Sequence, residues 1–167
     1  LAARMLEYSR TQNASEHEER KPIRLVELVR ETSGAMEHVR QAKGQHLNLI
    51  ESPGAANVCI LGEPAKIQRL IVNLLDNASR YAPQGSTIEI AVRRDTGGLM
   101  LSVANHGPVI PAELRERVFE PYYRLPGSGS DGSGLGLAIV KEIAAQHAAT
   151  VELSSMTRTD GTVVNVM

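Results

Sequence analysis

Residues 131–137 read Asp131-Gly-Ser-Gly-Leu-Gly-Leu137, and the helix-like sequence Ala-Ile-Val-Lys-Glu-Ile follows at once. Glycines let the backbone approach a ligand closely, and a helix that begins in such a loop presents unpaired N–H groups and the positive end of its dipole. This pattern predicts a phosphate site and, with it, a nucleotide ligand. The Gly-x-Gly-x-Gly spacing fits neither the dinucleotide-binding fingerprint nor the P-loop. The Gly- and Ser-rich stretch at 122–133 is expected to form a mobile lid.

The composition is that of one globular domain with a short appendage. The chain has 167 residues, of which 42% are hydrophobic and 22% charged, and its formal net charge is −1. This balance gives no indication of nucleic-acid binding. No stretch approaches the roughly 20 apolar residues of a membrane span, so the sequence predicts a soluble chain. It begins at Leu1 without a Met, and we expect it to be part of a longer protein.

Aromatic residues are scarce, with no Trp and one Phe, which predicts an aliphatic core. The one cysteine, Cys59, lies in the apolar stretch 58–61. A lone cysteine excludes an internal disulfide and suits a reducing compartment. We expect its thiol to be buried and inert.

Hydrophobic spacing predicts an α+β fold, a two-layer sandwich in which helices cover one face of a mixed, mostly antiparallel sheet. Helices are expected at residues 1–16, 25–43, 64–81, 135–147 and, as a short turn, near 111–117. Strands are expected at 45–51, 57–61, 87–94, 99–104, 151–154 and 162–166. The charged segment 16–21 is interpreted as a linker that Pro22 closes. Residues 1–21 are therefore expected to form the appendage, and residues 22–167 the domain.

The helix predicted at 64–81 carries a second signal. Its apolar residues fall on one arc, and a polar stripe of Asn73, Asn77, Arg80 and Tyr81 lies along the border of that arc. Asparagine is a poor helix former, so two of them four residues apart contribute little to helix stability. A carboxamide oxygen is a hard neutral ligand that suits Mg²⁺, an arginine can bind phosphate, and a tyrosine ring can contact an adenine.

Four motifs in this order and spacing resemble the ATP-binding catalytic domain of bacterial sensor histidine kinases, in the wider group of gyrase, Hsp90 and MutL ATPases. The first, Asn73-Leu-Leu-Asp-Asn-Ala-Ser-Arg-Tyr81, resembles the N box of that family. Val103-Ala-Asn-His-Gly-Pro-Val-Ile-Pro111 and residues 131–137 resemble its two glycine boxes. Phe119-Glu-Pro-Tyr-Tyr-Arg124 resembles its F box, and Gly161-Thr162 its last small motif. Residues 1–14 resemble the end of the dimerisation hairpin that precedes the domain.

The resemblance implies a Bergerat-type ATP-binding fold with ATP and Mg²⁺ as cofactors. It implies that Asn77 holds the metal, and that the nucleotide contacts Asn73, Asn77, Arg80, Tyr81, Asn105, Gly107, Ile110, Tyr123, Arg124, Gly132, Gly134, Leu135, Gly136, Leu137 and Thr162.

The chain also departs from the family pattern. Where the family usually has an aspartate that accepts a hydrogen bond from the adenine amino group, this chain has Asn105. Its carboxamide keeps an acceptor oxygen but carries no charge. Val109 replaces the second glycine of the first glycine box, and Ala148-Ala149 stands where the family often has Gly-Gly.

Phosphoryl transfer requires mainly positioning and neutralisation of charge. In hydrolytic relatives a glutamate four residues before the magnesium-binding asparagine activates water, and here that position is Asn73, which cannot accept a proton. The resemblance therefore implies a kinase domain that donates the γ-phosphoryl group to a histidine on a dimerisation domain outside this chain. From there the group would pass to an aspartate of a response regulator.

The implied parent is a homodimer anchored in the bacterial inner membrane, with this domain in the cytoplasm. Two alternatives remain open. One is a regulatory module that binds ATP without transferring phosphate. The other, a serine kinase of the anti-sigma-factor type, is disfavoured by the hairpin-like N-terminal segment.

Overall fold

The computed structural model describes residues 19–95, 98–127, 132–155 and 161–167. The helix predicted at 1–16, most of the linker and the centre of the predicted lid lie outside these ranges. In the described part of the chain, no helix combines the length and apolar character needed to cross a membrane.

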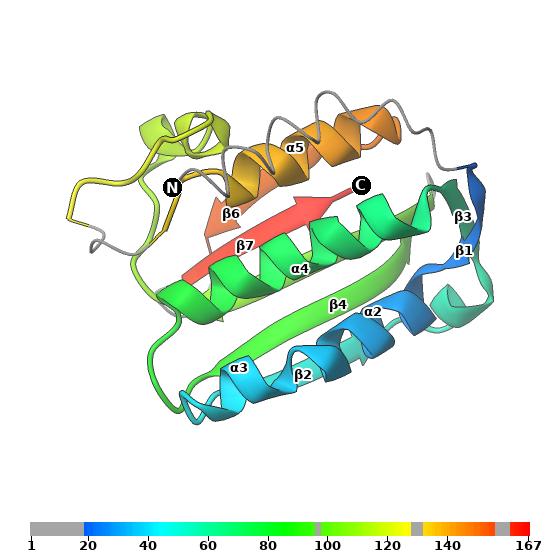
Figure 1. Cartoon of the computed structure of the whole chain (residues 1–167), viewed down its shortest axis with the longest axis horizontal. Helices are drawn as coiled ribbons and strands as arrows, with labels where there is room; N and C mark the ends of the chain where they lie inside the picture. The colour runs from blue at the N-terminus through cyan, green and yellow to red at the C-terminus, as the bar shows by residue number, and fades with distance from the viewer. Residues whose placement is uncertain (1–18, 96–97, 128–131, 156–160) are drawn as a thin grey trace.

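In the described part of the chain, four α-helices form one layer (Figure 1). They are α2 (Leu25–Ala35), α3 (Glu37–Gln41), α4 (Pro64–Tyr81) and α5 (Gly136–Gln146). Proline at the first position of α4 suits a helix start, because its missing N–H would have no partner there. The described residues also form three short 3₁₀ turns: η1 (Ala55–Asn57), η2 (Ala112–Leu114) and η3 (Arg117–Phe119).

The second layer is a five-stranded sheet of order β2-β4-β5-β7-β6. Its strands are β2 (His46–Glu51), β4 (Thr87–Asp95), β5 (Gly98–His106), β6 (Val151–Ser155) and β7 (Gly161–Val166). The β2–β4 pair is parallel and the others are antiparallel. Helices α2, α4 and α5 cover one face of this sheet (Figure 1). The structure thus confirms the predicted α+β sandwich.

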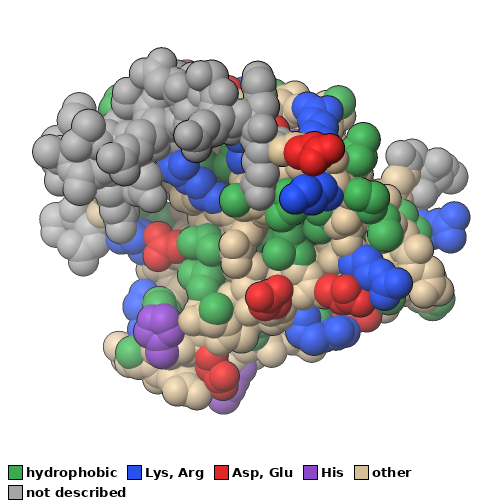
Figure 2. Space-filling model, turned by 45° about the vertical axis from the view of Figure 1, so that its right-hand side comes forward, with side chains coloured by type: hydrophobic (Ala, Val, Ile, Leu, Met, Phe, Trp, Pro, Cys, Tyr) green, Lys and Arg blue, Asp and Glu red, His purple; other side chains and the backbone are tan. Residues whose placement is uncertain are grey.

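The core between the layers is aliphatic, as the composition predicts. Ile71 of α4, Val140 and Ile143 of α5, and Ile88 and Ile90 of β4 are fully buried. Burying such a side chain stabilises the fold by about 1.5–3 kcal/mol. The apolar face of α4 packs against the sheet and so sets the orientation of the helix about its axis. The polar residues that border this face must then lie at the edge of the helical layer. On the surface drawn in Figure 2, basic and acidic side chains are interspersed.

The structure differs from the expected elements in several places. The helix predicted at 25–43 is broken at Met36, which separates α2 from α3. The strand predicted at 57–61 begins later, as β3 (Cys59–Gly62), after η1. It pairs with the unpredicted β1 (Lys21–Arg24) in a separate two-stranded sheet. Instead of the single short helix expected near 111–117, η2 and η3 form two 3₁₀ turns.

The prediction that Cys59 is buried is wrong, because its side chain is exposed. A two-stranded sheet turns alternate residues to solvent. Leu61, two residues further along β3, is also 64% exposed. The apolar stretch 58–61 therefore does not mark a core strand.

Candidate functional site

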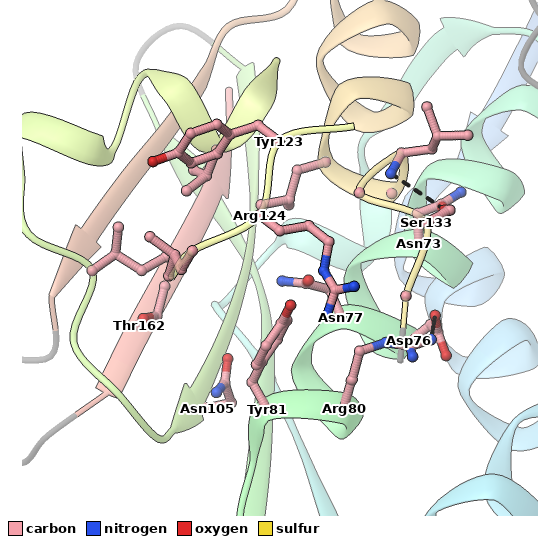
Figure 3. A pocket seen from close by; sticks show the side chains of 18 of the residues that line it. Asn73, Asp76, Asn77, Arg80, Tyr81, Asn105, Tyr123, Arg124, Ser133 and Thr162 are labelled. Atoms are coloured by element: carbon pink, nitrogen blue, oxygen red, sulfur yellow. Dashed lines mark hydrogen bonds and ion pairs between the residues drawn. The ribbon is translucent and has the colours of Figure 1, made fainter. Parts of the chain in front are cut away.

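A cavity of about 800 Å³ opens between α4, the segment after β5, the segment after η3 and the N-terminus of α5 (Figure 3). Every residue that sequence analysis proposed for the site lines this cavity, with the exception of Gly107. Segments far apart in the chain thus meet at one place. The ligand contacts assigned to these residues remain predictions.

Helix α4 supplies one wall. Asn73 donates its Nδ2 hydrogen to the backbone oxygen of Arg69 at 2.8 Å, within the same helix. The Oδ1 atom of Asn73 lies 3.5 Å from the point where a Cβ on Gly136 would stand, so the start of α5 comes close to this side chain. Asn77 projects into the cavity one turn further along α4 (Figure 3).

Arg80 is held at the edge of this wall. Its Nη2 atom lies 3.0 Å from Oδ2 of Asp76, four residues earlier on α4. Three atoms of its side chain also lie within 3.8 Å of the point where a Cβ on Gly132 would stand. The glycine loop therefore packs directly on Arg80, and the φ of +128° at Gly132 is one that other residues rarely adopt.

The opposite wall is the end of the sheet. Asn105 of β5 stands in register with Thr162 of β7, and each is 7% exposed. The Nδ2 atom of Asn105 donates to the backbone oxygen of His106 at 2.9 Å. This bond fixes the orientation of the amide and leaves Oδ1 as the group that can accept a hydrogen bond from a ligand. The side chain points into the cavity (Figure 3).

Gly107 lies behind this wall and not on it. Its φ is +151°, and a Cβ there would stand only 2.7 Å from the backbone oxygen of Tyr81. Glycine is required because the segment after β5 passes close to the end of α4. The structure thus gives Gly107 a packing role, and its expected contact with the nucleotide remains a prediction.

The glycine loop forms the third wall. Gly134 has a φ of +70°, and a Cβ on it would lie 2.7–2.9 Å from the backbone of Tyr122. The Tyr122 N–H donates to the Gly134 oxygen at 2.9 Å, which ties the two ends of the intervening segment together. Tyr122 itself has a φ of +66°. Helix α5 starts at Gly136, so its N-terminus faces the cavity.

Two side chains from the segment after η3 enter the same space. The ring of Tyr123 is covered by the guanidinium of Arg117, whose Cζ lies 4.6 Å from the ring centroid. Arg124 extends across the cavity toward Asn77 and Tyr81 (Figure 3). The site thus combines three asparagine amides, three arginines and a helix N-terminus.

Sequence analysis missed several residues of the lining, among them Met36, Arg69, Val72 and Asp76. Arg69 lies four positions before Asn73, and Asp76 lies four positions before Arg80, so helical spacing alone could have found both. Val72 is next to Asn73 in the chain, a spacing that does not place two side chains on the same helix face. Met36 stands at the break between α2 and α3, which the periodicity of the apolar residues does not mark, although Ser33-Gly34 comes just before it.

Comparison with known proteins agrees with this geometry. Residues 62–167 match the family described as "Histidine kinase-, DNA gyrase B-, and HSP90-like ATPase". Sensor protein QseC of Escherichia coli (strain K12) is 32% identical over 93% of this chain and 33% of its own length. Sensor-like histidine kinase SenX3 of Mycobacterium tuberculosis is 32% identical over 97% of this chain and 40% of its own length. The chain thus spans well under half of these relatives.

Among solved structures, the catalytic domain of histidine kinase ThkA superposes with a TM-score of 0.76 at 26% identity, covering 89% of this chain and 95% of that one. The predicted resemblance is confirmed. With its matching motifs gathered around one cavity, the chain belongs to the family of histidine kinase-, DNA gyrase B- and HSP90-like ATPases.

Proposed function

We propose that this chain binds Mg-ATP and donates the γ-phosphoryl group to a histidine on a dimerisation domain outside it. The carrying observation is a single cavity in which a buried amide at the sheet end faces a glycine-rich helix N-terminus and Asn77. An adenine at the amide end would place a triphosphate at the helix end. Family membership and the named sensor kinases among the relatives support the same function.

In this proposal the base binds between Tyr81, Ile110 and the Asn105–Thr162 pair. Oδ1 of Asn105 accepts from the adenine amino group, since its Nδ2 is already engaged with His106. Tyr81 is 36% exposed and offers its ring at the rim of the site. A base bound there removes these surfaces from water.

The phosphates bind at the other end. The N-terminus of α5 and the loop at 132–137 supply backbone N–H groups, and Arg80 and Arg124 supply positive charge. To bind a phosphate, the Arg80 guanidinium must either contact it while still paired with Asp76 or leave Asp76 for it.

Magnesium fits the groups that are present. Within the described part of the chain, no group of three or more His, Cys, Asp or Glu residues is arranged to hold a metal. Asn77, whose side chain enters the cavity, would hold the ion together with the nucleotide phosphates and water, as suits a cation that keeps several waters. When bound, the ion neutralises charge on the phosphates.

Transfer to histidine needs no base from this chain. The bond between the γ-phosphorus and the oxygen that bridges it to the β-phosphate breaks, and its electron pair leaves with ADP. The new P–N bond forms with the lone pair of a neutral imidazole nitrogen of the acceptor. Asn73 supplies no proton acceptor for water, so bound ATP is held until that nucleophile arrives.

The parent protein is then a dimeric, membrane-anchored sensor kinase with this domain in the cytoplasm, and its phosphohistidine serves a response regulator. Two tests address the proposal. Calorimetric titration should show Mg-dependent ATP binding that Asn77→Ala abolishes. With γ-labelled ATP, label should move to the histidine-bearing segment of the parent only when this chain is added. Binding without transfer would instead support a regulatory module.

A further inference from the structure

A buried polar network holds the C-terminal end of α4. Gln45 and Ser79 are 5% and 2% exposed. The Ser79 hydroxyl donates to Oε1 of Gln45 at 2.7 Å, and Nε2 of Gln45 donates to the backbone oxygens of Ser79 and Ala82, each at 3.0 Å. The Lys43 ammonium donates to the Ser79 oxygen at 2.8 Å. We call Lys43, Gln45 and Ser79 the α4 clasp.

The clasp satisfies groups that a helix end leaves open. The last carbonyls of a helix have no partner within it and carry the negative end of its dipole. Here an amide and an ammonium from the segment between α3 and β2 supply the donors. The backbone adds two bonds, from Gly85 N–H to the Lys43 oxygen and from His46 N–H to the Ser86 oxygen. The loop between α3 and β2 and the loop between α4 and β4 lie at the same end of the sandwich (Figure 1).

The clasp fixes the last turn of α4, which carries Tyr81 on the base-binding side of the proposed site. Gln45 binds the backbone oxygens of Ser79 and Ala82, and Tyr81 lies between these two residues in the chain. The Tyr81 carbonyl in turn abuts Gly107, which follows the Asn105–His106 pair. Because Gly107 has no side chain, no flexible group separates its backbone from the Tyr81 carbonyl. If the last turn of α4 moves, the backbone that follows β5 must therefore move with it.

We propose that the α4 clasp is a positioning device for base recognition: it sets the distance between Tyr81 and Asn105, and so the selectivity for adenine. This inference rests on the proposed nucleotide binding. Arg80 lies on the same turn, but Asp76 and Gly132 hold it separately, so phosphate binding should depend much less on the clasp.

The test uses Gln45→Met, which keeps the length of the side chain and removes every clasp bond of residue 45. Ser79→Ala is a milder second variant that removes the hydroxyl bound to Gln45. Ser79→Thr keeps a hydroxyl at this position and should therefore retain the ATP affinity that Ser79→Ala loses. Val29→Ala is the matched control, since Val29 is fully buried in α2 and does not line the cavity. Dissociation constants for ATP, GTP and tripolyphosphate, each with Mg²⁺, are measured by calorimetry well below the melting temperature of every variant.

Gln45→Met should weaken ATP binding about tenfold, as expected when a buried polar group loses its partner. Tripolyphosphate binding should stay within about twofold, and the preference for ATP over GTP should shrink. If Gln45→Met does not fold, Ser79→Ala carries the same test with a loss of about threefold. Equal losses for ATP and tripolyphosphate, or an equal loss in Val29→Ala, would overturn the positioning role. Failure of the wild-type chain to bind ATP would refute the proposed function itself.

Discussion

Gly134→Ala should destabilise the protein far more than Gly85→Ala, although both glycines have a φ of +70°. Alanine in this left-handed region costs about 1–2 kcal/mol at either position. At Gly85 the new methyl group meets nothing within 4 Å. At Gly134 it would stand 2.7–2.9 Å from the carbonyl carbon, Cα and oxygen of Tyr122, which are backbone atoms that cannot rotate away.

Relief of this overlap must move Tyr122 away from Gly134 and break the 2.9 Å bond between them. Overpacking costs about 1–3 kcal/mol and the hydrogen bond about 0.5–1.5 kcal/mol. We therefore expect Gly134→Ala to lower the free energy of unfolding by about 2–4 kcal/mol more than Gly85→Ala does. Urea denaturation measures both values. ATP affinity should fall only in the Gly134 variant, and equal losses of stability would refute the reasoning.

Three further predictions follow from single positions. Ala148→Gly should raise the free energy of unfolding by about 0.5–1 kcal/mol in urea titrations, since Ala148 has a φ of +55° just after α5, where glycine is favoured. Asn105→Ala should cost about 1–3 kcal/mol of ATP binding in calorimetry; an unchanged affinity would place the base elsewhere. Asn73→Glu should speed phosphate release by up to ~100-fold at saturating Mg-ATP, the low end of general-base contributions. Normal binding without faster turnover would show that a missing base is not what suppresses hydrolysis.

The sequence predicts the helix at 64–81 and its polar border well because one strong periodicity determines both. The buried face of α4, with Ile71 and Leu74, leaves only the border free to line a cavity. The motifs at Asn105 and Gly134 are short and depend on backbone geometry that few residue types allow. Patterns of this kind can be identified without knowing what packs against them.

The missed features depend on partners that are distant in sequence. The spacing of Met36 and Val39 continues the phase of α2, so periodicity gives no sign of the break. Pro22 is typical of a linker, yet it is accommodated opposite Leu61 because β1 and β3 form a sheet of two edge strands. Ala148, which stands where the family often has glycine, has a left-handed φ of +55°, a conformation that glycine adopts more readily than alanine.

The most consequential departure, asparagine in place of aspartate at position 105, is explained by its surroundings. The side chain is 7% exposed, and its Nδ2 donates to the His106 carbonyl oxygen at 2.9 Å. An aspartate there would bring a carboxylate against a carbonyl, with the cost of burying a charge added. The amide donates to that carbonyl and still offers its own oxygen to a ligand. A neutral acceptor on a fixed amide is weaker than a charged one but demands less desolvation. If Asn105 binds the base as proposed, recognition depends on the orientation that the bond to His106 gives its neutral amide.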